Sequence, residues 1–204
     1  MVVGITGASG TVYGVRLLEV LRDLGVETHL VMTRAARRVA ELETGYAVDH
    51  IEGLAGVSYA NDEIDAPIAS GSFRTAGMIV APCSIKSLSA IANSYNDGLL
   101  VRAADVVLKE RRKLVLVPRE TPLSLVHLRN MALVTEAGAT VLPAAPGFYH
   151  RPREIAQLVD FVVQRIVDHL GLDVALVPRW GEGDRGAESG KRAARSRPAR
   201  RRRP

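Results

Sequence analysis

Gly4-Ile5-Thr6-Gly7-Ala8-Ser9-Gly10 joins a short apolar run, Val2–Thr6, to an amphipathic segment, Thr11–Leu24. The first run predicts a buried β-strand, and the second predicts an α-helix whose apolar face consists of valines and leucines. Glycines in such a turn let the backbone approach an anion closely, and the helix N-terminus offers unpaired N–H groups to it. The stretch therefore predicts an anion or nucleotide site at the first turn of an α/β fold.

The rest of the chain continues this alternation of strands and helices. Further strands are predicted at Glu27–Met32, Gly77–Ala81, Lys113–Val117 and Ala139–Leu142. Further helices are predicted at Ala35–Glu43, Ser84–Ala92, Leu99–Lys109, Ser124–Glu136 and Arg153–Leu170. The segment Gly45–Gly71 predicts no regular element. Apolar strands alternating with helices indicate a Rossmann-like (flavodoxin-like) parallel sheet with helices on both faces, in which ligands bind beyond the carboxyl ends of the strands.

The positive charge of the chain is concentrated at its C-terminal end. Residues 181–204 hold nine basic and three acidic side chains, which leaves a net charge of −1 on residues 1–180. A segment rich in Gly, Ala, Pro and Arg cannot build a core. We therefore predict one α/β domain over residues 1–180 and a disordered basic tail over residues 181–204. Its basic residues would allow nonspecific binding of nucleic acid or an acidic partner, but the composition favours a solvated extension with no partner.

The sequence also predicts the compartment and the absence of some kinds of site. Cys83 is the only cysteine, so no intramolecular disulfide can form, which fits a reducing cytoplasm. No apolar run reaches the ~18 residues of a membrane span, and no signal peptide is recognisable. The five histidines show no metal-ligand spacing, so no metal is expected. Since no histidine is placed beside Cys83, this thiol is interpreted as a packed side chain.

Polar side chains follow several of the predicted strands. Thr33 follows the second strand and Ser84 the third, and each could cap a helix or bind a phosphate. Arg119 and Glu120 follow the most apolar strand, where charges are costly unless they pair or face a ligand. Tyr149, in a Pro- and Gly-rich loop after the last strand, could donate to a phosphate. The set predicts a phosphorylated ligand and leaves the reaction open.

Two nucleotide-binding classes are disfavoured by missing residues. The spacing of the first glycines also suits short-chain dehydrogenases, but these need a tyrosine and a lysine four residues apart, and no tyrosine here has a lysine at that spacing. The chain contains no G-x-x-x-x-G-K-[ST] pattern, which excludes a P-loop NTPase.

Four longer segments carry a more specific pattern: GITGASGTVYGVRLLEVL, APCSIKSLSAIA, RAADVVLKERRKLVLVPRETPLS and LPAAPGFYHRP. Together with PRWGE near the end, they resemble the UbiX family of flavin prenyltransferases over nearly all of residues 1–183. The resemblance implies that reduced FMN, bound between subunits of a homododecamer, accepts a dimethylallyl group from dimethylallyl phosphate at N5 and then at C6. It further implies that the prenylated FMN passes to a UbiD-type decarboxylase and that no metal takes part.

The resemblance also implies roles for individual residues. Those implied to bind FMN are Gly7, Ala8, Ser9, Thr33, Ser84 and Arg102. Those implied to hold the allylic phosphate are Lys109, Arg119, Tyr149 and Arg165. Glu120 is implied to be the acid/base residue, with Ser9, Lys109 and Glu43 as further catalytic groups. Lys86 and Trp180 receive no role.

Two alternatives remain open at this level. A related flavoprotein cysteine decarboxylase would share the fold and FMN, but the early histidine and the cysteine-bearing flap of that lineage are not found here. An FMN-binding carrier or assembly partner of a decarboxylase would bind the flavin without chemistry. The full set of phosphate-site residues favours the prenyltransferase.

Overall fold

The structure, a computed structural model, describes residues 1–181 and contains a six-stranded parallel sheet with the order β3-β2-β1-β4-β5-β6. The strands are β1 (Val2–Ile5), β2 (His29–Met32), β3 (Val57–Ala60), β4 (Gly77–Cys83), β5 (Lys113–Pro118) and β6 (Thr140–Val141). The helices are α1 (Thr11–Asp23), α2 (Arg34–Glu43), α3 (Val48–Glu52), α4 (Ile85–Ala92), α5 (Leu99–Lys109), α6 (Leu125–Glu136), α7 (Ile155–Leu170) and the 3-10 turn η1 (Pro67–Ala69).

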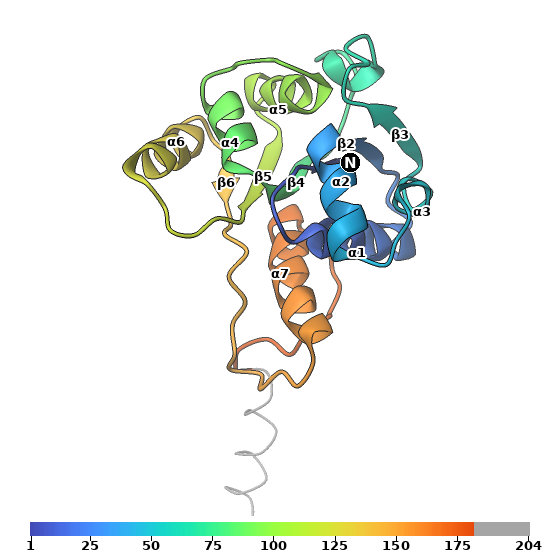
Figure 1. Ribbon diagram of the computed structural model, residues 1–204, viewed down its shortest axis with the longest axis vertical. Helices are drawn as coiled ribbons and strands as arrows, with labels where there is room; N and C mark the ends of the chain where they lie inside the picture. Colours follow the sequence, from blue (N-terminus) through green and yellow to red (C-terminus); the bar gives the residue numbers. More distant parts are fainter. Residues whose placement is uncertain (182–204) are drawn as a thin grey trace, which may run out of the picture.

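Helices cover both faces of the sheet (Figure 1), with α1 and α7 on one side and α4 and α5 on the other. The alternation of side chains along β1 shows how this arises. Val3 and Ile5 are fully buried in the cluster that contains α1 and α7, whereas Val2 lies in the cluster that contains α4 and α5. The predicted parallel α/β fold with helices on both faces is thus confirmed.

One strand was missed by the sequence analysis. The expectation that Gly45–Gly71 holds no regular element is wrong, because the segment contains α3 and the edge strand β3, which pairs in parallel with β2. The residues of β3 are exposed or half-buried, and Val57 is 37% exposed, so no continuous apolar run marks them. The five predicted strands have the flavodoxin-like order, and β3 extends it to the Rossmann order 3-2-1-4-5-6.

The end of α5 determines where two later residues lie. Arg111 N donates to Leu108 O at 2.9 Å and Arg112 N donates to Val107 O at 2.9 Å, which is the Schellman pattern of a helix C-terminus. Arg111 takes the left-handed position, with φ 55°, where glycine is usual. The turn directs the chain into β5 and leaves Arg112 beside the loop that precedes β4.

Two predictions concern the chain as a whole. No helix within residues 1–181 has the length and apolarity needed to cross a membrane. The predicted basic tail, residues 181–204, lies outside the described residues apart from Gly181.

Candidate functional site

A cavity of about 420 Å³ opens at the carboxyl ends of the central strands. It lies beside the junction of β1 and β4, where the strand order reverses and where open α/β sheets bind their ligands. Its lining residues are Gly7, Thr33, Arg34, Ala35, Asn61, Ser84, Lys86 and Ser87.

Two helix N-termini meet at this cavity. Thr33 caps α2, its hydroxyl accepting from Ala36 N at 3.1 Å, and Ser84 caps α4, its hydroxyl accepting from Ser87 N at 3.3 Å. Both hydroxyls therefore cap a helix and also belong to residues that line the cavity. The positive ends of the two helix dipoles, together with Arg34 and Lys86, make the cavity attractive to a phosphate group.

Thr6 connects the turns that carry the cavity, and sequence reasoning missed it. It is fully buried, and its hydroxyl donates to Pro82 O at 2.7 Å while accepting from Ser84 N at 2.7 Å. The end of β1 is thereby fixed to the turn between β4 and α4. The sequence feature that could have identified it is the position of a threonine at the end of the otherwise apolar run Val2–Thr6.

Gly7 allows the first turn to approach α2. A β-carbon on Gly7 would lie 2.5 Å from the β-carbon of Ala35, a distance that a real side chain does not reach. Since Gly7 and Ala35 both line the cavity, any side chain at Gly7 would change its shape. Ala8, the next residue of this turn, is buried.

Ser9 and Glu43 form a polar cluster at the start of α1. The Glu43 carboxylate accepts from Gly10 N at 2.8 Å and from Thr11 N at 3.4 Å. Burial raises the pKa of Glu43, but hydrogen bonds from Ser9, Gly10 and Thr11 and the charge of Arg119 together hold this pKa below its usual value. Glu43 is thus kept as a carboxylate at the helix N-terminus.

Arg119 and Tyr13 extend this cluster. Arg119 directly follows β5, and its positive charge acts on both Glu43 and Tyr13. Burial raises the pKa of the Tyr13 hydroxyl, and the charge of Arg119 partly opposes this rise. Sequence reasoning missed Tyr13, although its position three residues after Gly10 in a helix places it over the turn. The Glu120 carboxylate accepts a hydrogen bond from Thr121 N at 2.9 Å. Among the described residues, Arg119 and Glu120 do not form an ion pair with each other.

Lys109 lies at the opposite end of the sheet. It is the last residue of α5 and precedes the start of β5, whereas Arg119 follows the end of β5. The six residues of β5 rise roughly 3.3 Å each, so its two ends lie about 20 Å apart. Lys109 Nζ pairs with Glu110 Oε1 at 2.7 Å, and this hydrogen bond and charge hold the pKa of Glu110 below its usual value.

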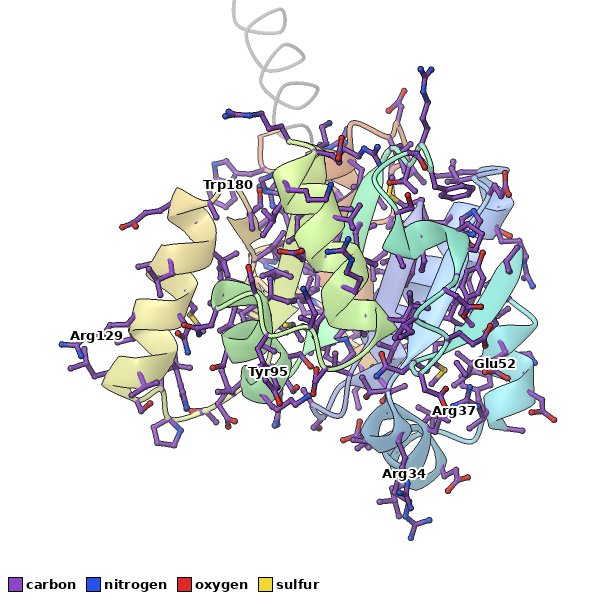
Figure 2. All side chains as sticks on the ribbon, turned by 90° about the horizontal axis from the view of Figure 1, so that it is seen from above. Arg34, Arg37, Glu52, Tyr95, Arg129 and Trp180 are labelled. Carbon is purple, nitrogen blue, oxygen red and sulfur yellow. The ribbon has the colours of Figure 1, made fainter. Side chains whose placement is uncertain are left out.

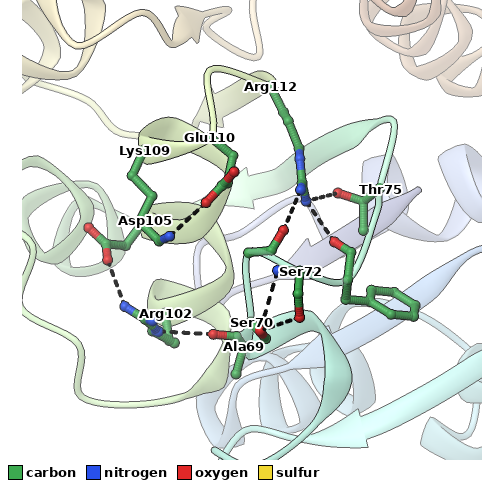
Figure 3. Close-up of polar contacts among 11 residues, drawn as sticks. Ala69, Ser70, Ser72, Thr75, Arg102, Asp105, Lys109, Glu110 and Arg112 are labelled. Atoms are coloured by element: carbon green, nitrogen blue, oxygen red, sulfur yellow. Dashed lines mark hydrogen bonds and ion pairs between the residues drawn. The ribbon is translucent and has the colours of Figure 1, made fainter.

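Arg102 does not line the cavity, although the resemblance implies a role in FMN binding. It lies on α5, where Nε donates to Ala69 O at 3.1 Å and Nη1 pairs with Asp105 at 3.0 Å (Figure 3). Arg102 lies in the first turn of α5, whose N-terminal N–H groups bind Asn61, a residue of the cavity lining, whereas Lys109 lies at the other end of this helix.

Tyr149 and Arg165 form a third group, around a separate cavity of about 150 Å³. The Tyr149 ring packs edge-on against Phe161 at 5.7 Å and Trp180 at 5.1 Å. Arg165 pairs with Asp168 at 3.2 Å. Figure 2 shows Trp180 far across the molecule from Arg34, a residue of the larger cavity.

Sequence comparison identifies the family. A protein-family model described as Flavoprotein matches residues 1–167. A flavin prenyltransferase UbiX from Thauera aromatica is 55% identical over 180 residues, which cover 88% of this chain and 93% of the relative. The chain belongs to the UbiX family of flavin prenyltransferases.

Two solved structures share the fold of this UbiX-family chain. A UbiX protein crystallised with FMN and dimethylallyl pyrophosphate superposes with a TM-score of 0.87 at 48% identity, covering 88% of this chain and 96% of that one. A dodecameric FMN-dependent UbiX-like decarboxylase from Escherichia coli superposes with a TM-score of 0.86 at 50% identity, and the match covers 88% of this chain and 97% of that one. The predicted family, fold and enzyme class are therefore confirmed, whereas the residue roles stay predictions.

Two further features of the UbiX-family chain concern the chemistry available to it. Cys83 is buried, and burial raises the pKa of its thiol to about 12, so it is not a thiolate nucleophile at neutral pH. No group of three or more His, Cys, Asp or Glu side chains among residues 1–181 is arranged to hold a metal ion. The expectation that no metal takes part stays a prediction.

Proposed function

We propose that this enzyme transfers a dimethylallyl group from dimethylallyl phosphate to reduced FMN, within a homododecamer, and supplies the product to a UbiD-type decarboxylase. The cavity at the junction of β1 and β4 carries the proposal, since two capped helix N-termini and two cationic residues line it. The relatives support it, because one was crystallised with FMN and dimethylallyl pyrophosphate and another is dodecameric. We further infer a single flavin-binding domain over residues 1–180 and a cytoplasmic location.

The residues of the cavity fit FMN. A phosphate fits the N-termini of α2 and α4, where Thr33 and Ser84 offer hydroxyls and Arg34 and Lys86 offer positive charge. Gly7 lines the cavity, and its lack of a side chain lets the first turn lie against Ala35, which lines the cavity too. Bound in its reduced form, FMN would supply the electron-rich ring atoms, N5 and then C6, that take up the dimethylallyl group.

The residues implied to hold the allylic phosphate act on the prenyl donor. Breaking its allylic C–O bond leaves negative charge on the phosphate, and fixed cations at that position lower the barrier. We assign this role to Lys109, Arg119 and Arg165, with Tyr149 as a hydrogen-bond donor. Glu120 accepts and returns the proton that moves during the transfer.

Ser9 and Glu43 act at the first turn. The Ser9 hydroxyl is hydrogen-bonded to the Glu43 carboxylate, in the same turn that contributes Gly7 to the cavity lining. From this position Ser9 can pass a proton toward Glu120 or the phosphate. Glu43 also receives two backbone N–H groups of α1, so it orients the turn as well as the hydroxyl.

Several copies of the chain are needed to assemble this site. Arg119 and Lys109 are separated within one copy by the length of β5, and Tyr149 and Arg165 surround a different cavity from that of Thr33. In an oligomer, Lys109 and Arg102 of one copy complete the site at the strand ends of another. The loop that carries Tyr149 does the same from a further copy.

A compensating pair of substitutions tests the cavity. Gly7→Ala is expected to weaken FMN binding by about 10- to 100-fold, because the added β-carbon would push the turn away from Ala35. Ala35→Gly removes the opposing atom, so the double variant is expected to recover most of the affinity. Titrating the apoprotein with FMN by fluorescence measures this. An additive loss in the double variant would contradict the assigned contact.

The reaction is tested by product mass. Protein incubated anaerobically with FMN, dithionite and dimethylallyl phosphate is expected to release a flavin heavier than FMN by one prenyl unit. A parallel incubation with dimethylallyl pyrophosphate identifies the preferred donor. Bound but unchanged FMN with both donors would refute the transferase and support an FMN carrier.

A further inference from the structure

The side chain of Arg112 connects the end of α5 to residues 69–76, the segment before β4 that we call the Gly71 loop (Figure 3). Its Nη2 donates to Gly71 O at 2.6 Å, and its Nη1 donates to Phe73 O at 2.8 Å and to the Thr75 hydroxyl at 3.4 Å. A planar guanidinium can hold two carbonyl groups at once from separate nitrogens, which a lysine ammonium cannot do in the same geometry. Arg112 therefore fixes the path of this loop.

The loop in turn lies against the Lys109–Glu110 ion pair. A β-carbon on Gly71 would come within 2.3 Å of Glu110 Oε1 and within 2.9 Å of Lys109 Nζ. Gly71 thus lies beside both charged groups and has no side chain that would displace them. Lys109 Nζ is paired with Glu110 Oε1 at 2.7 Å, so the loop lies next to the ion pair that orients the Lys109 ammonium.

A second arginine holds the beginning of the same loop. Arg102 donates from Nε to Ala69 O at 3.1 Å, and Asp105 fixes its guanidinium at 3.0 Å. Arg102 lies on α5, and Arg112 lies in the turn that follows the end of α5 at Lys109. The loop, the end of α5 and Lys109 therefore form one connected unit.

We propose that Arg112 is a positioning residue for prenyl transfer, which holds the Gly71 loop in place so that Lys109 meets the phosphate of the prenyl donor in a neighbouring copy. This inference rests on the proposed role of Lys109. A lysine side chain has many rotamers, and ordering it at the moment of binding costs conformational entropy. Confining it beforehand strengthens phosphate binding.

Phosphate binding can be measured without turnover. In the holoprotein with oxidised FMN, the dissociation constant for dimethylallyl phosphate is read by isothermal titration calorimetry. Arg112→Ala and Gly71→Ala are each expected to raise it by about 10- to 100-fold, and KM of the reduced enzyme should rise with it more than kcat falls. Arg112→Lys is expected to resemble Arg112→Ala, since one ammonium cannot hold both carbonyls.

The neighbouring residue provides a matched control. Arg111 makes no hydrogen bond or ion pair through its side chain within residues 1–181, and Arg111→Ala keeps a β-carbon at the same left-handed turn. It is expected to bind the donor as the unchanged protein does. FMN affinity and oligomer size, by size-exclusion chromatography, should be unaltered in all the variants.

The outcomes separate this inference from the proposed function. Normal donor binding in Arg112→Ala, with only a lower melting temperature, would mean a purely structural arginine and would overturn the inference. Normal binding in Gly71→Ala would overturn it even if Arg112→Ala failed to fold, because that substitution meets only the ends of flexible side chains. Normal binding in Lys109→Ala would instead refute the phosphate role of Lys109 itself.

Discussion

Co-expressed Lys109→Ala and Glu120→Gln subunits are expected to show about one quarter of wild-type prenylation, although each variant alone has little. Lys109 and Glu120 flank opposite ends of β5, so a site that uses both residues, as we propose, takes them from two different copies. If equal amounts of the two subunits assemble at random into a closed oligomer, about one site in four receives both intact residues. The prenylated product formed per bound FMN measures the recovery.

A second mixture serves as the matched control. Arg119 and Glu120 are neighbours after the same strand, so in the proposed site one copy contributes both. Co-expressed Arg119→Ala and Glu120→Gln subunits should therefore recover nothing, because every site lacks one of the two groups. Equal activity in both mixtures, or none in the first, would contradict a site shared between copies.

The sequence was most informative where the strands are buried on both faces. In β1, β4 and β5 nearly every side chain is buried, and such parallel strands are continuous apolar runs, so their ends were predicted to within two residues. Edge strand β3 has one pairing neighbour and exposed side chains. Its residues therefore lack both the apolar run and a regular alternation.

The site was predictable in part for a geometric reason. The carboxyl ends of parallel strands lie at one edge of a sheet, so residues directly after strands, such as Thr33, Ser84 and Arg119, could be grouped from the sequence. Lys109 ends a helix and Tyr149 lies in a long loop. The strand-end rule indicated Tyr149 only as a residue in the loop after the last predicted strand, and it did not indicate Lys109 at all, which only the family resemblance added to the group.

Residues that act through the backbone were hidden from sequence reasoning. Thr6 binds the carbonyl of Pro82 in β4 and the N–H group of Ser84 directly after β4, and Arg112 binds two loop carbonyls. The sequence does not indicate which residues will be the partners of such contacts, because almost every residue carries the same backbone C=O and N–H groups. Such contacts become apparent only when the three-dimensional path of the chain is known.

Glu120→Gln is expected to lower kcat for prenylation by about 100- to 10,000-fold while FMN binds normally. Glutamine has the size of glutamate and can still accept the hydrogen bond from Thr121 N, which is 2.9 Å long here. It cannot take up or release a proton in the way a carboxylate does. Single-turnover kinetics with pre-reduced FMN and dimethylallyl phosphate measure the chemical step apart from product release.

The size and selectivity of this loss distinguish proton transfer from electrostatics. If Glu120 only oriented Arg119, Glu120→Gln would weaken donor binding and leave much of the rate at saturating donor. If Glu120 moves the proton, donor affinity changes little and kcat collapses. Glu136→Gln, which removes one exposed carboxylate at the end of α6, controls for the change in charge. A Glu120→Gln variant with near-normal kcat would require another residue at the strand ends, such as Glu43, as the acid/base group.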